Sequence, residues 1–325
     1  MPELRYNPLL KDWTMVAEGR QARPVLPEDH CPFCPGSGKV PQSYDVLAYD
    51  NDFPPLMPDP PDPRSEGTAL YPVLPAYGKC EVVLYSPDHG ASLATLPLGH
   101  VRKLVDLWTE RYAALRADPR VKYVLIFENR GAEVGVTIPH PHGQIYAYPY
   151  VPQKIRVESE AFRAHRQSAG RCLLCDINAE ERGSGERLIL ESGTMLCYIP
   201  FFTDYPFGAM IASKAHRPDL TAFSEEEKTD LAAMLRAVVG GMDALYGRPF
   251  PYMMVLHQQP AAEDADSRDA HFHIEFYPPL RDRDKLKFLA SSETGAWAPC
   301  NPLAVEDTAP LLREAVRKAI ERMDA

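Results

Sequence analysis

The sequence lacks a long hydrophobic run. None of its apolar stretches approaches the roughly 20 residues that a membrane-spanning helix needs. Its first residues, MPELRYNPLL, lack the basic region and the apolar core of a signal peptide. We therefore expect no membrane partner and a cytoplasmic location.

Positive charge is scarce relative to negative charge. The 325 residues include 35 Lys and Arg against 45 Asp and Glu, which gives a net charge of −10. An acidic chain lacks the basic surface of a nucleic-acid-binding protein, so no nucleic-acid partner is expected. A small phosphorylated substrate is not excluded, because a few arginines can bind a phosphate inside an acidic protein.

The seven cysteines are an odd number and cannot all form disulfides within one chain. Cys31 and Cys34 form one C-x-x-C pair, and Cys172 and Cys175 form a second. In a chain without an export signal, such pairs indicate metal or redox chemistry more than a disulfide framework. The cysteines to which the sequence assigns no role are Cys80, Cys197 and Cys300.

Short strands and a few long helices are predicted along the chain. Runs of β-branched and aromatic residues bounded by Gly, Pro or Asp predict strands, and 3.6-residue periodicity predicts helices. Ser224 followed by Glu227 has the form of a capping box. The mixture predicts an α+β fold with a mostly antiparallel sheet. The predicted helices are 98–117, 224–246 and 305–323, and the predicted strands are 81–85, 123–127, 144–148, 188–190, 195–199, 209–212 and 271–277.

A weak internal repeat organises the chain. Each half contains a C-x-x-C pair, a strand followed by a histidine, a long helix, a further strand and an H-x-H pair, in that order. The same order of elements is hard to obtain twice by chance, and self-similarity of this kind indicates repeated structure. We therefore predict two similar halves, residues 1–160 and 161–325.

The repeat aligns two sets of four metal-binding residues. Structural zinc sites are tetrahedral and often combine two thiolates with two imidazoles. Each half therefore predicts one zinc ion, whereas the alternative is a redox dithiol or two unrelated buried thiols. The predicted ligands are Cys31, Cys34, His89 and His140 in the first half, and Cys172, Cys175, His216 and His271 in the second.

Residues 139–144, PHPHGQ, are the most informative part of the chain. Side chains alternate between the two faces of a β-strand, so His140, His142 and Gln144 would share one face. Two imidazoles and an amide in this order suit one metal ligand, one nucleophile and one neutral hydrogen-bond donor. The alternative is a histidine-rich loop without chemistry.

Residues 129–144, NRGAEVGVTIPHPHGQ, resemble the active-site signature of the galactose-1-phosphate uridylyltransferase family. This family is the transferase branch of the histidine-triad superfamily. The resemblance implies two histidine-triad-like halves that form a half-barrel of mostly antiparallel strands flanked by helices, and it implies a homodimer. Further matches are Arg5-Tyr6-Asn7-Pro8, Arg20-x-x-Arg23-Pro24, Asn51-Asp52-Phe53, Ser86-Pro87-Asp88-His89 and Phe276-Tyr277-Pro278-Pro279.

The resemblance implies a ping-pong reaction in galactose metabolism, the Leloir pathway. His142 would attack the α-phosphorus of UDP-glucose and release glucose 1-phosphate, and galactose 1-phosphate would then accept the uridylyl group. Gln144 stands where the hydrolase branch has a third histidine. An amide can donate to a phosphoryl oxygen but does not readily deliver a proton, so Gln144 favours transfer over hydrolysis.

The resemblance also implies which residues bind the substrates. Two arginines would clamp phosphate, although exposed arginines are common for no functional reason. An Asn-Asp-Phe segment would hold the nucleoside, an asparagine and a threonine would donate to phosphate, and a lysine and a glutamate would contact the hexose. These residues are Arg20, Arg23, Asn51, Asp52, Phe53, Asn129, Thr137, Lys287 and Glu293.

The second half departs from the family pattern. Some members hold iron there with a glutamate and three histidines; Glu158, His257 and His273 would match, but Glu275 stands in place of the last histidine, so iron is not expected. The sequence also diverges after Glu293, which leaves the hexose open. The alternative functions are an ADP-glucose phosphorylase or another nucleotidylyltransferase of the same fold, and a non-catalytic zinc-stabilised nucleotide-binding protein.

Overall fold

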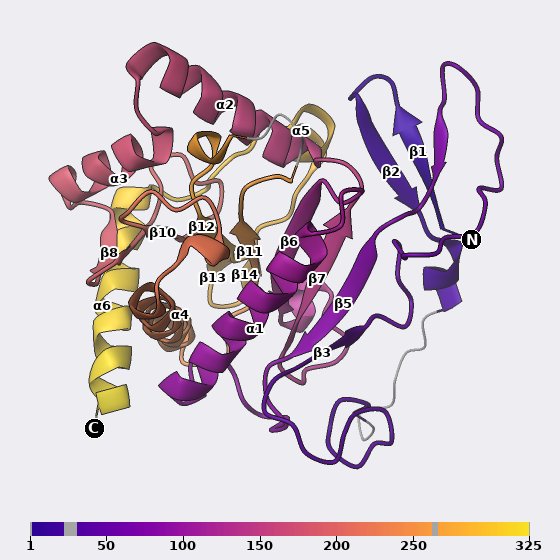
Figure 1. The fold of residues 1–325 in the computed structure, drawn as a ribbon. Helices are drawn as coiled ribbons and strands as arrows, with labels where there is room; N and C mark the ends of the chain where they lie inside the picture. Colours follow the sequence, from indigo (N-terminus) through magenta and orange to yellow (C-terminus); the bar gives the residue numbers. More distant parts are fainter. Residues whose placement is uncertain (1, 23–30, 262–265, 325) are drawn as a thin grey trace.

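The chain folds around one large β-sheet (Figure 1). The computed structural model describes residues 2–22, 31–261 and 266–324. The predicted α+β class, with a large antiparallel sheet flanked by helices, is confirmed. The strands of the large sheet are β3 (Leu47–Asp50), β5 (Lys79–Leu84), β6 (Tyr123–Arg130), β7 (His142–Tyr148), β8 (Leu188–Glu191), β9 (Met195–Tyr198), β10 (Met210–Ser213), β11 (Tyr252–His257) and β12 (His273–Tyr277).

The strand order repeats outward from the centre of the sheet. The sheet runs β3-β5-β7-β6-β11-β12-β10-β9-β8, and every neighbouring pair is antiparallel. At the centre, β6 pairs with β11, so that Phe127 lies opposite Val255. Strands β7 and β12 are the next strands on the two sides and so occupy equivalent positions. A helix, α2 (Gln153–Ala169), runs through residue 160, and the division into residues 1–160 and 161–325 stays a prediction.

Helices cover both faces of the sheet (Figure 1). On one face, α1 (Leu98–Arg116), α4 (Glu225–Tyr246) and α6 (Val305–Asp324) bury apolar stripes in the main hydrophobic core. On the other face, α2 and α3 (Leu173–Ser184) pack on strands β9 and β10 of the second half. Within the described residues, no helix is long and apolar enough to cross a membrane.

Helix α4 begins and packs as its sequence predicts. The Ser224 hydroxyl accepts a hydrogen bond from the Glu227 amide at 3.2 Å, and the Glu227 carboxylate accepts one from the Ser224 amide at 2.7 Å. This reciprocal pair is the predicted capping box. Further along, a Cβ at Gly241 would lie 2.3 Å from a Val316 methyl group, so the glycine is what allows α4 and α6 to cross closely.

The predicted helices and strands are present with shifts of a few residues at their ends. Helix α2 was not predicted, because only Ile155 and Phe162 are buried and the apolar stripe is too narrow to stand out. Strand β11 is the strand that the repeat predicts between the long helix and the H-x-H pair of the second half, but the sequence analysis gave it no bounds, because a short apolar run without alternation does not distinguish a strand from a helix. The remaining elements are β1 (Glu3–Asn7), β2 (Asp12–Val16), β4 (Val73–Pro75), β13 (Leu280–Asp282), β14 (Lys285–Leu286) and α5 (Ser291–Ala296).

Candidate active site

Strand β7 presents His142 and Gln144 on the face opposite the main core. Ile145 lies in the core with α1 and α4, so by alternation His142 and Gln144 project the other way. Gly143, between them, has no room for a side chain, because a Cβ there would lie 2.4 Å from the Tyr85 hydroxyl oxygen. The glycine of the PHPHGQ segment therefore lets the strand lie directly against the core.

The His142 ring is fixed by the backbone of its own segment. Its Nδ1 lies 2.8 Å from the His140 carbonyl oxygen, which can only accept a hydrogen bond. Nδ1 therefore carries the proton in the neutral ring, and the lone pair lies on Nε2. Phe33 packs edge-to-face on the ring with the two centroids 5.3 Å apart. Tautomer and orientation are thus both set, as a nucleophilic imidazole requires.

A chain of hydrogen bonds orients the Gln144 amide. Arg20 donates from Nη1 to the Tyr146 hydroxyl at 3.1 Å, and that hydroxyl donates to Gln144 Oε1 at 3.3 Å. With the amide oxygen engaged in this way, the amide nitrogen is the group that Gln144 offers to a ligand. Arg20 and Tyr146 therefore make Gln144 a donor beside His142.

A cavity of about 140 Å³ lies in front of these side chains. Lys39 forms an ion pair with Asp52 at its edge, and Asn51 accepts a hydrogen bond from the Phe53 amide at 2.9 Å. The structure thus brings together most of the residues that the sequence singled out for the nucleoside and phosphate. The lining residues already named from the sequence are Arg20, Asn51, Asp52, Phe53, Thr137, His142 and Gln144, and those that sequence reasoning missed are Pro32, Phe33, Lys39, Tyr49, Val82 and Ile138.

A larger cavity of about 800 Å³ opens on the other side of His142. Thr137 and His142 line both cavities, and Asn129 lines the larger one. Hydroxyl and amide side chains such as these are neutral hydrogen-bond donors of the kind that bind phosphoryl oxygens. One imidazole that borders two cavities can reach groups held in either of them.

The first C-x-x-C pair lies beside strand β7 as part of a four-residue cluster. The ligand atoms of Cys31, Cys34, His89 and His140 all lie within 4.8 Å of one another. Cys34 Sγ is 3.5 Å from His89 Nδ1, and both sulfurs are 3.6–3.7 Å from His140 Nδ1. The other ring nitrogen of His140 donates to the Ser86 carbonyl oxygen at 2.7 Å. A backbone partner of this kind fixes the tautomer of a metal-binding histidine.

The second C-x-x-C pair repeats this arrangement. Cys172, Cys175, His216 and His271 form a cluster of the same size. The two sulfurs lie 3.4 and 3.5 Å from His271 Nδ1, and His271 Nε2 donates to the Ser213 carbonyl oxygen at 2.8 Å. The two halves thus repeat the ligand types and also the backbone contact that orients one histidine.

Both clusters fit a tetrahedral metal ion. Bond lengths of about 2.3 Å to sulfur and about 2.0 Å to nitrogen place the two donor atoms about 3.5 Å apart at a tetrahedral centre. The measured sulfur–nitrogen distances of 3.4–3.7 Å agree with this value. Burial lowers the pKa of His140, which keeps the imidazole neutral as a ligand must be. Each Cys₂His₂ set therefore forms a candidate metal site with four protein ligands.

A third cluster lies in the second half. Donor atoms of Glu158, His257, His273 and Glu275 also lie within 4.8 Å of one another. His257 Nδ1 lies 2.8 Å from the Glu158 carboxylate, and Lys154 pairs with Glu275 at 2.5 Å. The sequence had placed three of these residues together, and Glu275 joins them. The absence of iron stays a prediction.

Two of the predicted substrate-binding residues, Lys287 and Glu293, are not among the residues that line the cavities beside His142. A third, Arg23, lies outside the described residues. Lys287 places Nζ 5.0 Å from the ring centroid of Tyr205, and Glu293 accepts a hydrogen bond from the Ala290 amide at 3.2 Å at the start of α5. Within one chain, Lys287 and Glu293 therefore lie apart from His142 and Gln144.

Of the three cysteines without an assigned role, two lie in the hydrophobic interior and one lies at the surface. Cys80 and Cys197 are buried in hydrophobic clusters, and Cys300 is exposed. Burial raises the pKa of the Cys80 thiol to about 12, which leaves it protonated and unreactive at neutral pH. We therefore interpret Cys80 and Cys197 as core residues.

Glu128 is a buried acid that the sequence analysis did not single out. It lies on β6 facing the core, where one carboxylate oxygen accepts a hydrogen bond from the Tyr252 hydroxyl at 3.1 Å. The other carboxylate oxygen has no hydrogen-bond partner among the described residues. Burial raises the pKa of Glu128 from 4.5 to about 7, although Arg130 opposes this shift.

We expect Glu128 to make the protein less stable as the pH rises. Between pH 4.5 and about 7, the folded chain holds a proton that the unfolded chain releases. The stability that the protonated Glu128 contributes is fully present below the pKa of Glu128 in the unfolded chain. It is lost as the pH rises through the pKa of Glu128 in the folded chain. At pH 8, Glu128→Gln should therefore raise the free energy of unfolding by up to about 3 kcal/mol, with a smaller effect near pH 5. Urea unfolding at the two pH values measures this difference.

The matched control is Glu110→Gln, an exposed glutamate on α1. This substitution should change the free energy of unfolding by the same amount at pH 5 and at pH 8. A Glu128→Gln protein whose free energy of unfolding changes by the same amount at both pH values would contradict the raised pKa.

Family models match most of the chain. Residues 1–152 match galactose-1-phosphate uridyl transferase, N-terminal domain, and residues 158–290 match galactose-1-phosphate uridyl transferase, C-terminal domain. A galactose-1-phosphate uridylyltransferase from Thermotoga maritima is 42% identical over 315 residues, covering 97% of this chain and 98% of the relative. The fold and these matches define a nucleotidyltransferase.

Solved structures agree. One described as the structure of uridylyltransferase superimposes with a TM-score of 0.89 at 34% identity, covering 98% of this chain and 99% of the other. The chain belongs to the galactose-1-phosphate uridylyltransferase family. An ADP-glucose phosphorylase from Arabidopsis thaliana, with bound ADP-glucose, has the same fold, with a TM-score of 0.74 at 22% identity, covering 97% and 99% of the two chains.

Proposed function

We propose that the protein transfers a uridylyl group from UDP-glucose to galactose 1-phosphate through a covalent intermediate on His142. The observation that carries this proposal is the His142 ring, which is held through Nδ1 at 2.8 Å from a backbone carbonyl and borders two cavities. The 42% identical Thermotoga maritima relative supports the choice of substrates.

The proposed reaction proceeds in two displacements. Nε2 of His142 attacks the α-phosphorus of UDP-glucose, and the bond from that phosphorus to the bridging oxygen breaks, so glucose 1-phosphate leaves with its electron pair. A phosphate oxygen of galactose 1-phosphate then attacks the same phosphorus. The phosphorus–nitrogen electrons return to the imidazole, and UDP-galactose leaves. The acceptor is already an anion, so neither step needs a base to deprotonate it.

Gln144 suits this chemistry because it is a donor that does not exchange protons. The Tyr146 hydroxyl donates to its amide oxygen at 3.3 Å, which directs the NH₂ group toward the cavity. We propose that this group donates to a phosphoryl oxygen and stabilises the negative charge of each transition state. Water, unlike the phosphate acceptor, would need a base, so the intermediate lasts until the acceptor arrives.

The substrates would be held by the residues around the two cavities. We propose that Asn51, Asp52 and Phe53 contact uridine, and that Arg20 binds the phosphates. On the same proposal, Asn129 and Thr137 donate to phosphoryl oxygens from the larger cavity. Lys39 also borders the nucleoside cavity, where it would neutralise Asp52.

We propose that the metal in both Cys₂His₂ sites is zinc and that its role is structural. Four protein ligands leave no position for water or substrate. When bound, the ion supplies rigidity: His140 belongs to the first set, and its carbonyl oxygen accepts from His142. The first site would therefore hold the nucleophile in place.

We also propose a homodimer in which Lys287 and Glu293 of each subunit serve the hexose bound by the other. The exposed side chains between them support this proposal: Phe288 and Leu289 are 75% and 55% exposed. Apolar side chains with this exposure gain stability when a second chain covers them.

Covalent labelling tests the reaction. Protein mixed with UDP-glucose labelled in the uridylyl group should retain an acid-labile label on the peptide that contains His142, and added galactose 1-phosphate should release it as UDP-galactose. A panel of UDP-glucose, ADP-glucose and several hexose 1-phosphates fixes the substrates. Turnover with ADP-glucose alone would favour the phosphorylase alternative, and nucleotide binding without any label would favour a non-catalytic protein.

A further inference from the structure

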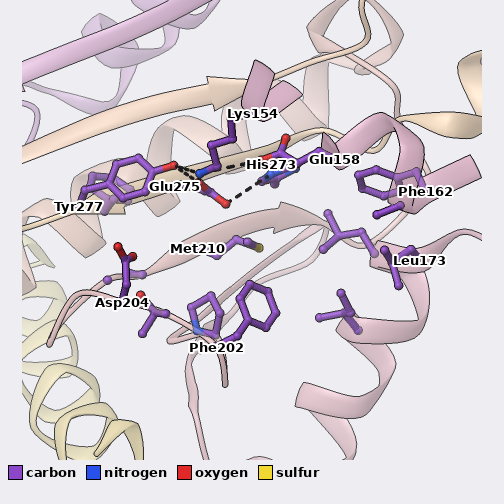
Figure 2. Close-up of a pocket in the computed structure, with 18 residues that line it drawn as sticks. Lys154, Glu158, Phe162, Leu173, Phe202, Asp204, Met210, His273, Glu275 and Tyr277 are labelled. Carbon is purple, nitrogen blue, oxygen red and sulfur yellow. Dashed lines mark hydrogen bonds and ion pairs between the residues drawn. The ribbon is translucent and has the colours of Figure 1, made fainter. Parts of the chain in front are cut away.

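A second pocket lies in the second half, between α2, α3 and the sheet (Figure 2). Its volume is about 280 Å³, larger than the 140 Å³ nucleoside cavity. For comparison, an apolar cavity of about 150 Å³ binds benzene. Most of the lining is apolar, and Phe202 at the pocket is 61% exposed. The main apolar lining residues are Phe162, Leu173, Leu174, Ile177, Phe202 and Met210.

This pocket is the counterpart of the nucleoside cavity in the first half. Leu173 and Leu174 lie between the cysteines of the second C-x-x-C pair, as Phe33 lies between those of the first. His273 begins strand β12 as His142 begins the equivalent strand β7. The two cavities therefore occupy the same place relative to the two metal clusters and the two equivalent strands.

His273 presents a hydrogen-bond acceptor at one end of the pocket. Its Nδ1 donates to the His271 carbonyl oxygen at 2.9 Å, which leaves the lone pair on Nε2. The side chain is only 5% exposed, and Nε2 makes no hydrogen bond among the described residues; the Glu275 carboxylate lies 3.8 Å away. Figure 2 shows His273 beside Glu158, Lys154 and Glu275 above the apolar floor. Because Nε2 faces the pocket, it can accept a hydrogen bond from a ligand held there.

The charge of this pocket is opposite to that of the nucleoside cavity. Glu158, Asp204 and Glu275 line it with a single permanent cation, Lys154, which is paired with Glu275 at 2.5 Å. Behind the lining, His257 lies 2.8 Å from the Glu158 carboxylate and 3.4 Å from that of Glu275, so Asp204 is the carboxylate without a cationic partner among these residues. The nucleoside cavity instead has Arg20 and Lys39 against Asp52. The second pocket would therefore repel a phosphate and attract a cation, although the two pockets are built on equivalent elements.

We propose that this pocket binds a small amine, with an aromatic or branched apolar body among the leucine, phenylalanine and methionine side chains and an ammonium group at the His273 end. The ammonium group donates to Nε2 of His273 and to the Glu275 carboxylate, and Asp204 on the opposite side of the pocket adds negative charge. The apolar body removes the lining from water. A ligand of about eight non-hydrogen atoms that makes these contacts binds in the millimolar range.

Three probes of similar size test the proposal on the full-length, metal-loaded protein. Benzylamine carries the ammonium group, benzyl alcohol is neutral and benzoate is an anion. Ligand-observed NMR and calorimetry should show benzylamine binding at least about tenfold more tightly than benzyl alcohol, and no binding of benzoate. Equal binding of all three, or of none, would overturn the proposal.

Three variants locate the binding. Ala161 is an exposed residue of α2 at the pocket, and Ala161→Phe should fill the space and abolish benzylamine binding. Ala164→Phe, on the same helix but away from the lining, is the matched control and should bind as the parent does. Asp204→Asn should weaken benzylamine several-fold and leave benzyl alcohol unchanged.

Two results would assign the site differently. If Ala161→Phe binds benzylamine as tightly as Ala164→Phe does, the amine binds elsewhere. If metal analysis finds a third ion per chain and its removal alone creates amine binding, the carboxylates and His273 hold a metal and the amine is a substitute for it. Neither measurement depends on turnover of nucleotide sugars. The amine-binding proposal can therefore be wrong while the uridylyltransferase proposal is right, and the uridylyltransferase proposal can be wrong while the amine-binding proposal is right.

Discussion

Replacing His142 by glycine should abolish transfer between UDP-glucose and galactose 1-phosphate, with a loss of at least about 10,000-fold in kcat. The variant lacks the only proposed nucleophile, whereas the pocket that binds the nucleotide is otherwise intact. Free imidazole fits the space that the ring occupied and should restore turnover. In the presence of imidazole, the nucleotidyl group should pass through a small-molecule uridylyl-imidazole in place of the protein adduct. Product formation with and without imidazole, together with loss of the covalent label, measures this.

The matched control is His165→Ala. His165 lies on α2, where it contacts Asp176 at 2.8 Å, and it borders neither cavity at His142. It should keep parental kcat and should not respond to imidazole. If His142→Gly retained transfer near the parental rate, the covalent mechanism would be wrong, and both sugar phosphates would have to react in a single complex.

Removing one metal ligand should destabilise the protein strongly at either site, but it should affect catalysis mainly at the first. Structural zinc contributes on the order of 10 kcal/mol of apparent binding free energy, so Cys31→Ser or Cys172→Ser should each lower the free energy of unfolding by at least about 3 kcal/mol. Each variant should also lose one metal ion per chain. Metal analysis and urea unfolding test both statements.

The two variants should differ in kcat because the two sites hold different strands. His140 is a ligand of the first cluster, and its carbonyl oxygen fixes the His142 ring. His271 has the same relation to His273, which borders the other pocket. At a temperature where both variants are folded, Cys31→Ser should lose far more kcat than Cys172→Ser. Equal losses would show that the first site does not position the nucleophile.

Local sequence was sufficient to predict the strand that carries His142 and Gln144. The alternation of a strand determines that His142 and Gln144 share a face, and the glycine between them is required by contact with Tyr85. The two C-x-x-C pairs and their distant histidines were also identifiable, because a metal ion demands particular donor types and the internal repeat supplied the pairing twice. Capping of α4 was predicted for a similar reason, since a helix terminus is satisfied by residues three apart.

Contacts between residues far apart in the chain could not be predicted from local sequence patterns. Tyr146 and Arg20, which orient Gln144, are 126 residues apart, and no local pattern connects them. Helix α2 has too few buried residues to give a clear periodicity, yet it forms one wall of the second pocket. Glu128 lies one residue beyond the predicted strand 123–127, and only the burial of its carboxyl group in the folded chain raises its pKa to about 7.

The sequence by itself predicted the nucleophile, the donor beside it, eight metal ligands and two related halves, because each prediction depends on residue type and short spacing; the structure brings the eight predicted ligands into two clusters. The tertiary structure decided what the two halves do differently. Equivalent strands bear His142 with Gln144 in one half and His273 with Glu275 in the other. Side chains from separate elements then give the nucleoside cavity more cations than anions and the second pocket more anions than cations. Charge balance in a pocket depends on which distant residues converge there, and convergence is a property of the folded chain.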